Sequence, residues 1–208
     1  MKVIEEHYEV LTDLSSPLTL LKAIEHAGRT CYKSYDKATE DSCLTFCKML
    51  ISRNHEAVLE HSSLSVKFTV DRAIANELVR HRIASYCQES TRYVNYSNER
   101  FGNEIKVILP CTLKKDSEPY KVWYNSCLQC ESSYMKLLSL GEKPEIARNV
   151  LPLSTATEIV CTANIREWRQ ILSLRTSVFA HPQMRSIMSK LLIYLKKRVP
   201  VLFDDITP

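Results

Sequence analysis

Glycine is unusually scarce in this chain, which has 208 residues and only three glycines, Gly28, Gly102 and Gly141. Glycine-rich turns bring backbone amides close to phosphate groups, both in the GxGxxG turn of dinucleotide-binding folds and in the P-loop. Three glycines this far apart exclude both motifs. A nucleotide bound by this chain must therefore be held by side chains rather than by a glycine-rich loop.

The arginines gather in two segments, residues 68–105 and 144–189. These segments hold ten of the thirteen arginines and none of the fifteen lysines. A solvated surface can use either residue, whereas the planar guanidinium grips a phosphate or a carbonyl in a fixed orientation. We therefore expect the two segments to converge on one anionic ligand. The net charge of +4 is too small to indicate a nucleic-acid partner by itself.

Apolar residues recur along the chain with the periods of strands and helices. The pattern predicts strands at residues 2–10, 60–70, 105–109 and 155–163. It predicts helices at residues 16–28, 40–53, from 71 into the arginines at 80–82, and at 120–140, 144–150, 164–175 and 182–198. The predicted core positions of the first three helices are Leu20, Leu21, Ile24, Leu44, Cys47, Leu50, Ile74, Leu78 and Val79. Because no repeat or linker interrupts these elements, we expect one compact α+β domain spanning residues 1–208.

The eight cysteines are spaced irregularly. Only Cys127 and Cys130 have the spacing of a ligand pair, and they stay open as a metal or redox candidate. For the others we expect free buried thiols and no metal site. No apolar run approaches the ~20 residues of a membrane helix, and the first residues do not form a secretory signal. The expected location is the cytoplasm, without a membrane partner.

The sequence RHRIASYCQESTRY, residues 80–93, concentrates three arginines and a histidine. It can be a charged helix end, with His81 an incidental surface residue, or a ligand-binding segment. Ser90, Thr91 and Arg92 offer hydroxyl and guanidinium donors suited to a phosphate. His81 lies between two arginines and should resist protonation, because nearby positive charge disfavours the imidazolium ion.

Arg175 ends the helix expected at residues 164–175, on the same side as the apolar Trp168 and Leu172. Two interpretations are open for it. The guanidinium can cap the helix C-terminus and reach water. It can also form the inner wall of a pocket, where a low dielectric strengthens its hold on a ligand.

Several motifs resemble the flavin-dependent thymidylate synthase family. The family's RHR-x7-Ser motif is matched by Arg80, His81, Arg82 and Ser90. Further agreement lies, in the same order, in GRTCYKS (28–34), EHSSLSVKFTV (60–70), ARNVLPLST (147–155) and TANIREWRQILSLR (162–175). The resemblance covers roughly residues 20–195 and implies a single domain with a mainly antiparallel central sheet flanked by helices.

The resemblance also implies ligands residue by residue. The residues that it assigns to FAD are His61, Ser63, Arg80, His81, Arg82, Asn164, Arg166 and Gln170. Those that it assigns to the substrate dUMP are Glu77, Arg80, Gln88, Ser90, Arg92, Arg148 and Arg175. Arg175 is the implied catalytic residue, because its family counterpart engages the uracil ring.

The sequence departs from a common family form at two adjacent positions. Cys87 stands where asparagine is frequent, and Gln88 stands where glutamate is frequent. The change at Gln88 removes a carboxylate, for which Glu89 is the nearest replacement. Cys87 and Ser90 both invite interpretation as nucleophiles, but we expect Cys87 to serve packing and Ser90 to bind phosphate.

The implied reaction is the reductive methylation of dUMP to dTMP. Methylenetetrahydrofolate supplies the carbon, NADPH supplies electrons through FAD, and tetrahydrofolate is released. The resemblance further implies a homotetramer in which subunits share active sites. Two alternatives remain: a basic protein that binds RNA or DNA, and a regulatory protein that binds nucleotide without catalysis. The sequence argues against the first, because aromatic residues do not interleave the arginines as a stacking platform would.

Overall fold

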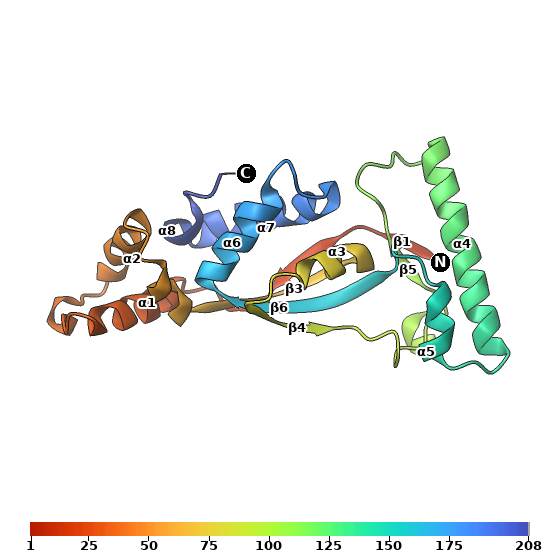
Figure 1. Cartoon of the computed structure of the whole chain (residues 1–208), viewed down its shortest axis with the longest axis horizontal. Coiled ribbons are helices and arrows are strands. Elements are labelled where there is room, and N and C mark those ends of the chain that lie inside the picture. Colours follow the sequence, from red (N-terminus) through yellow and green to blue (C-terminus); the bar gives the residue numbers. More distant parts are fainter. Residues whose placement is uncertain (208) are drawn as a thin grey trace. The chain divides into compact units, whose positions relative to one another are not determined.

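The structure is a computed structural model that describes residues 1–207 and mixes helices with strands (Figure 1). The strands are β1 Lys2–Ile4, β2 His7–Val10, β3 Ser63–Asp71, β4 Ala84–Gln88, β5 Lys106–Ile108 and β6 Ala156–Asn164. The α-helices are α1 Leu18–Thr30, α2 Ser42–Ser52, α3 Arg72–Leu78, α4 Glu118–Ser139, α5 Pro144–Ala147, α6 Ile165–Thr176, α7 Pro182–Arg198 and α8 Pro200–Phe203. Four short 3-10 segments complete the chain: η1 Tyr35–Lys37, η2 Glu56–His61, η3 Glu99–Phe101 and η4 Arg148–Val150.

The strands form two sheets. Four of them make an antiparallel sheet in the order β2-β3-β6-β4, which confirms the predicted fold class. β1 and β5 make a separate parallel pair, with Lys2 opposite Lys106. The single strand predicted for residues 2–10 is therefore wrong, because the chain leaves one sheet at Glu5 and Glu6 and enters the other. β4 is a strand that the sequence pattern does not predict, because the arginines and the histidine just before it are the dominant feature of residues 80–93.

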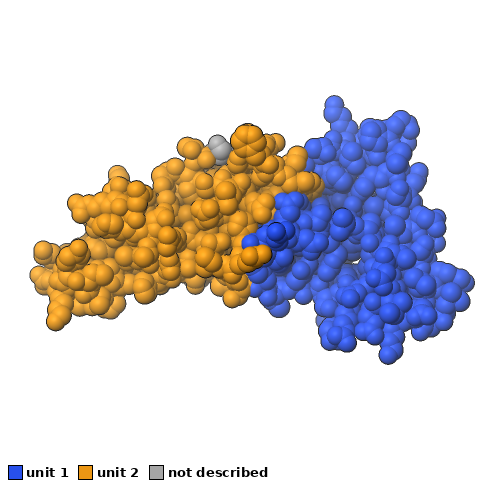
Figure 2. Space-filling view, viewed as in Figure 1, with its two compact units in different colours: residues 1–7, 68–80, 86–160 blue, residues 8–67, 81–85, 161–208 orange. Residues whose placement is uncertain are grey.

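The chain divides into two compact units (Figure 2). Unit 1 contains residues 1–7, 68–80 and 86–160, and unit 2 contains residues 8–67, 81–85 and those from 161 onward. Each unit draws on three separate segments of the sequence. The RHR motif is thus divided, since Arg80 belongs to unit 1 and His81 and Arg82 belong to unit 2.

The core of unit 1 forms where α4 meets the parallel strand pair. It contains Tyr96, Ile105, Val107, Cys127, Tyr134 and Ala147. The hydroxyl of Tyr134 accepts a hydrogen bond from the Tyr96 amide at 3.3 Å, so its one polar atom is satisfied. α4 begins where the Ser117 hydroxyl caps the Tyr120 amide at 3.3 Å.

The core of unit 2 forms between α6 and α7, which pack against each other. Trp168 of α6 is fully buried, and its indole N–H donates to the Leu64 carbonyl of β3 at 2.9 Å. α7 buries Met184, Ile187, Met188, Leu191 and Leu195. α1 packs against α2 in the same unit and buries Leu20, Leu21 and Ile24 as predicted.

Two residues predicted to lie inward are exposed, Leu44 and Val79, each with 37 % of its surface accessible. In α2 the inward position belongs to Cys43, one turn before the buried Cys47. α3 ends at Leu78, so Val79 lies just beyond the helix and its period. In both helices the predicted inward position is one residue beyond the buried one, since Cys43 and Leu78 are buried and Leu44 and Val79 are not.

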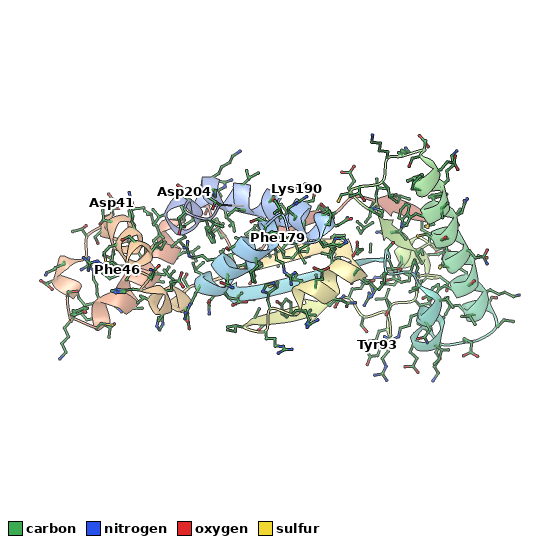
Figure 3. All side chains as sticks on the ribbon, turned by 45° about the horizontal axis from the view of Figure 1, so that its top comes forward. Asp41, Phe46, Tyr93, Phe179, Lys190 and Asp204 are labelled. Carbon is green, nitrogen blue, oxygen red and sulfur yellow. The ribbon has the colours of Figure 1, made fainter. Side chains whose placement is uncertain are left out.

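Gly28 does not end the first helix as predicted, since α1 continues to Thr30. A Cβ atom at Gly28 would lie 2.6 Å from Cε1 of Phe46, the side chain on α2 that Figure 3 labels. Phe46 is also covered by the Arg29 guanidinium, 5.0 Å from the ring centre. The glycine is therefore required for the close approach of α2 to α1.

Arg29 fastens the segment that follows α1. Its guanidinium is buried and donates to the Glu25 carboxylate at 2.6 and 2.9 Å. It also donates to the carbonyls of Ser34 and Lys37, at 3.1 and 3.0 Å. One side chain thus satisfies backbone acceptors just before and at the end of the short 3-10 helix η1.

All eight cysteines are free thiols. Half of them are buried, namely Cys43, Cys47, Cys127 and Cys161. Burial raises the pKa of the Cys47 thiol to about 12 and that of Cys127 to about 11. Such thiols are protonated at neutral pH and act as small apolar residues. Among the helices of residues 1–207, none combines the length and apolar character needed to cross a membrane.

Replacing Arg29 with alanine leaves the buried Glu25 carboxylate without its cation. We expect Arg29→Ala to lower the free energy of unfolding by about 3–5 kcal/mol, the usual cost of breaking a buried ion pair. Urea unfolding would measure the loss. The matched control is Lys22→Ala on the exposed face of α1, which should stay within about 0.5 kcal/mol of the natural protein. Equal stabilities for both variants would contradict the role of Arg29.

Candidate active site

The RHR motif lies between a helix and a strand. α3 begins where the Asp71 carboxylate accepts a hydrogen bond from the Ile74 amide at 2.7 Å. The helix ends before Arg80, and residues 80–82 are a turn followed by irregular backbone. The interpretation of RHR as a helix end is therefore wrong. Consecutive side chains of the motif are not spaced by helical steps, and buried His81 is flanked by exposed Arg80 and Arg82.

His81 contacts Arg175 in unit 2. The Nε atom of Arg175 donates a hydrogen bond to Nε2 of His81 at 2.9 Å. The imidazole is 8 % exposed, and Arg175 is half-buried. Contact with a buried ring favours the inner-wall interpretation of Arg175. A guanidinium nitrogen is always a donor, so Nε2 of His81 must be the acceptor and the ring must be neutral.

The electrostatics of His81 agree with this geometry. Burial, and then the positive charge of Arg175, lower the pKa of His81 to about 4. The predicted neutral histidine is confirmed, but the cause differs, since burial comes first and the neighbouring cation is Arg175 rather than Arg80 or Arg82. On its other side, Nδ1 of His81 lies 3.6 Å from the Glu167 carboxylate, beyond ordinary hydrogen-bond distance.

The predicted flavin residues of α6 gather at its N-terminus. The Asn164 carboxamide caps the helix by accepting from the Glu167 amide at 2.8 Å. The Ile165 amide donates to the Ser62 carbonyl at 2.9 Å, which brings the segment of exposed His61 and Ser63 beside the helix start. Residues from two distant parts of the sequence therefore meet within unit 2.

A cavity of about 530 Å³ opens at this helix end. Its lining consists of Glu56, Glu60, Ile83, Asn164, Arg166, Glu167, Arg169, Gln170, Ser173, Asp205, Ile206 and Thr207. The volume lies in the range of small-molecule sites. Three of the predicted flavin residues, Asn164, Arg166 and Gln170, thus line one hollow.

The cations of this cavity have acidic partners. Arg166 donates to Glu60 at 2.7 Å and lies 3.6 Å from Glu56, and all three side chains are solvent-accessible. Arg169 makes a two-point ion pair with Asp205, at 2.7 and 2.6 Å, which also lowers the pKa of that carboxyl group. Exposed ion pairs contribute little and exchange readily, so Arg166 can change partner. Arg169 is 11 % exposed and anchors the C-terminal segment.

The predicted phosphate-binding residues lie in unit 1. Ser90 and Arg92 occupy a turn after β4, where the Ser90 hydroxyl accepts from the Arg92 amide at 3.3 Å. Nε of Arg92 donates to Glu145 of α5 at 3.0 Å, and Arg148 begins η4 three residues later. The ion pair therefore brings the Ser90–Arg92 turn to the segment of Arg148. Arg148 itself is exposed, and no ion-pair partner for it is found within residues 1–207.

The two unusual positions lie at the end of β4. The Gln88 carboxamide donates to the Thr157 hydroxyl at 3.3 Å. Glu89 does not replace the missing carboxylate, because it accepts from the Tyr96 hydroxyl at 2.7 Å. Cys87 is exposed, so the packing role predicted for it is wrong in this chain. The predicted Glu77 lies half-buried in the last turn of α3.

A second cavity, of about 670 Å³, lies in unit 1 and was not predicted. Glu89 and Tyr96 line it, and none of the predicted dUMP residues does. Burial and the Glu89 charge raise the pKa of Tyr96 above its usual value. The sequence does not indicate a role for Tyr96. Its hydrogen bond to Glu89 depends on the turn that lies between the two residues, and that turn is seen only in the structure.

The comparisons with known proteins agree with one another. The family profile described as "Thymidylate synthase complementing protein" matches residues 16–201. A flavin-dependent thymidylate synthase from Pyrococcus furiosus is 31 % identical over 92 % of this chain and 76 % of its own length. One from Geobacter sulfurreducens is 31 % identical over 89 % of this chain and 82 % of its own length. This chain belongs to the flavin-dependent thymidylate synthase family.

The solved structures support the fold of this family. A crystal structure described as the UMP/dUMP methylase PolB from Streptomyces cacaoi covers 98 % of this chain and 95 % of its own, with a TM-score of 0.76. At 21 % identity this likeness establishes the fold alone. The family resemblance drawn from the RHR-x7-Ser motif is confirmed.

The low pKa of His81 predicts a loss of stability in acid. The unfolded imidazole binds a proton below about pH 6.5, whereas the folded one stays neutral down to about pH 4. The unfolded state thus binds more protons in this window, so the free energy of unfolding should fall as the pH falls. The expected loss is about 3 kcal/mol.

Denaturant unfolding at pH 7 and pH 4 would measure this loss. In His81→Gln the part of this loss that comes from His81 should be absent. The control His26→Gln changes an exposed histidine and should show the same loss as the natural protein. Identical pH profiles for the natural protein and His81→Gln would contradict a buried neutral imidazole.

Proposed function

We propose that this chain reductively methylates dUMP to dTMP, with methylenetetrahydrofolate as the carbon donor. NADPH would be the reductant, through a bound FAD, and the folate product would be tetrahydrofolate. The proposal rests on family membership together with one geometric observation. Arg175 and His81, which are 94 residues apart in the sequence, form a direct hydrogen bond at a buried position. The RHR motif is thus connected, through His81, to Arg175, the residue that we propose as catalytic.

The residues of unit 2 fit a bound FAD. Asn164 and Gln170 present carboxamides to the first cavity, and Ile83 and Ile206 give it apolar walls for a flat ring. Its acidic side chains would repel a pyrophosphate, so Arg166 must exchange Glu60 for the phosphate oxygens. His61, Ser63, Arg80, His81 and Arg82 complete the proposed contacts. When bound, FAD supplies the reducing equivalents.

The residues of unit 1 suit the phosphate of dUMP. Ser90, Arg92 and Arg148 offer a hydroxyl and two guanidinium groups, a donor set that binds phosphate strongly. Arg92 is held by Glu145 in an exposed ion pair that a dianion can replace. Arg80, Glu77 and Gln88 are the remaining proposed contacts.

Arg175 is the proposed catalytic residue. Its Nε donates to His81, which fixes the plane of the guanidinium. We propose that the same guanidinium engages the uracil carbonyls. Negative charge develops on the carbonyl system when carbon is added to the ring. A cation that is already in place stabilises this charge more than water does, because water molecules would first have to reorient around it.

The alternative of a nucleic-acid-binding protein gains no support. A phosphate track needs arginines that are open along a surface. Arg169 is 11 % exposed and is held by Asp205, so it is not open to such a track. The second alternative, a regulatory protein that binds nucleotide without turnover, is distinguished from an enzyme by the activity assay described next.

The function is tested with the purified protein. We expect a yellow protein after incubation with FAD, bleaching of the flavin by NADPH, and formation of dTMP when dUMP and methylenetetrahydrofolate are added. Tetrahydrofolate rather than dihydrofolate should accompany dTMP. Nucleotide binding without bleaching or dTMP would indicate the regulatory alternative, and a protein that binds neither flavin nor dUMP would exclude the proposal.

Arg175→Ala should bind FAD normally and lose about 10²–10³ in kcat, the usual cost of removing one preorganised donor from a site of developing charge. Flavin absorbance and the rate of dTMP formation measure the two effects separately. Arg198→Ala is the matched control, because Arg198 also lies in the last turn of a helix but is exposed. Full activity in Arg175→Ala would remove this residue from the chemistry.

We also propose a homotetramer with active sites shared between subunits, and one domain that spans both units. The loop after α6 exposes Val178 and Phe179, at 71 % and 96 % (Figure 3 labels Phe179). Apolar side chains this exposed favour burial against another copy. A stable and active monomer in size-exclusion chromatography would contradict the tetramer. The free thiols agree with the cytoplasm as the proposed location.

A further inference from the structure

Glu167 is a nearly buried carboxylate beside the His81–Arg175 pair. It lies in the first turn of α6, and its side chain is 11 % exposed. The neighbouring Arg166 and Arg169 make their ion pairs with other acids. Within residues 1–207, the only basic side chain at ion-pair distance from the Glu167 carboxylate is His81, at 3.6 Å.

Helix capping does not explain this side chain. In a capping box the glutamate carboxylate reaches back to the amide of the N-cap residue. Here Asn164 accepts from the Glu167 amide at 2.8 Å, but among the described residues no return bond joins the carboxylate to the Asn164 amide. Burial raises the pKa of the carboxyl group, so an ion at this position costs stability. A residue that costs stability and caps nothing needs another role.

The tautomer of His81 supplies that role. Arg175 donates to Nε2, so the single proton of the neutral ring must sit on Nδ1. Nδ1 is the nitrogen that faces the Glu167 carboxylate. A negative charge on that side stabilises the Nδ1–H form electrostatically. The opposite tautomer would place a hydrogen on Nε2 against the N–H of Arg175, and the two donors would repel each other.

We propose that Glu167 is a positioning residue, which holds His81 in the Nδ1–H tautomer and thereby fixes the orientation of the Arg175 guanidinium. Glu167 also lines the first cavity, and we propose that its effect on Arg175 acts through the imidazole. Outer residues of this kind tune the groups that touch the ligand, commonly by about 10–100-fold in activity. The kinetic part of this inference rests on the proposed function, whereas the tautomer part concerns the protein alone.

The test compares Glu167→Ala and Glu167→Gln in the FAD-loaded protein. Nitrogen NMR of histidine-labelled protein identifies which ring nitrogen carries the proton, and His81→Gln assigns the signal. We expect a protonated Nδ1 in the natural protein. Glu167→Gln removes the charge but keeps the size of the side chain, and Glu167→Ala removes both. In both variants the proton should move partly to Nε2, and kcat should fall about 10–100-fold with flavin content unchanged.

Glu118→Ala is the matched control, because Glu118 lies in the first turn of α4 and is exposed; it should change neither tautomer nor rate. An unaltered Nδ1–H signal in Glu167→Ala overturns the inference, whatever the rate of that variant. If the natural protein forms no dTMP, the proposed function fails, and the NMR comparison still decides the role of Glu167. A Glu167→Ala protein that does not fold leaves the decision to Glu167→Gln, where an unaltered Nδ1–H signal overturns the inference.

Discussion

The hydrogen bond from Arg175 to a buried, neutral His81 constrains much of the proposed chemistry. Burying an imidazole without protonating it requires an acceptor role for one nitrogen and a proton on the other. Arg175 imposes this division, because its guanidinium can only donate. In return, the ring holds the Arg175 Nε–H, so that the remaining donors point in a defined direction. A flexible cation is thus converted into a fixed one.

The scarcity of glycine explains why the cations are organised in this way. A glycine-rich loop presents amides that are rigid and uncharged, and it needs no counterion. Side chains that replace such a loop are charged and long, and they repel one another when no ligand is bound. The structure places carboxylates beside them, as Glu60 lies beside Arg166 and Glu145 beside Arg92. Because these pairs are exposed, an arriving phosphate can take the place of the carboxylate at small cost.

Much of the fold could be predicted from the sequence, since the periodicity of apolar residues reports local structure. α4, α6 and α7 were predicted nearly to the residue, because capping residues and prolines mark their starts. The errors share a cause. β4 contains no charged residue and the RHR segment before it is strongly charged, but both depend on their neighbours in space, which the local sequence does not reveal. The exposed Cys87 was likewise misjudged from its average behaviour in proteins.

The candidate site was predictable only in part, for a reason that Glu167 illustrates. In the sequence it is a glutamate three residues after Asn164, and the capping pattern accounts for it fully. In the structure the cap is made by Asn164 alone, and the carboxylate turns to His81 instead. A glutamate three residues after an N-cap residue can thus complete the cap or face another side chain. Only the position of the His81 ring, 86 residues earlier in the chain, shows that Glu167 does the second. Sequence patterns identify which residues can carry chemistry, whereas the assignment of a proton to one nitrogen requires the three-dimensional arrangement of donors around it.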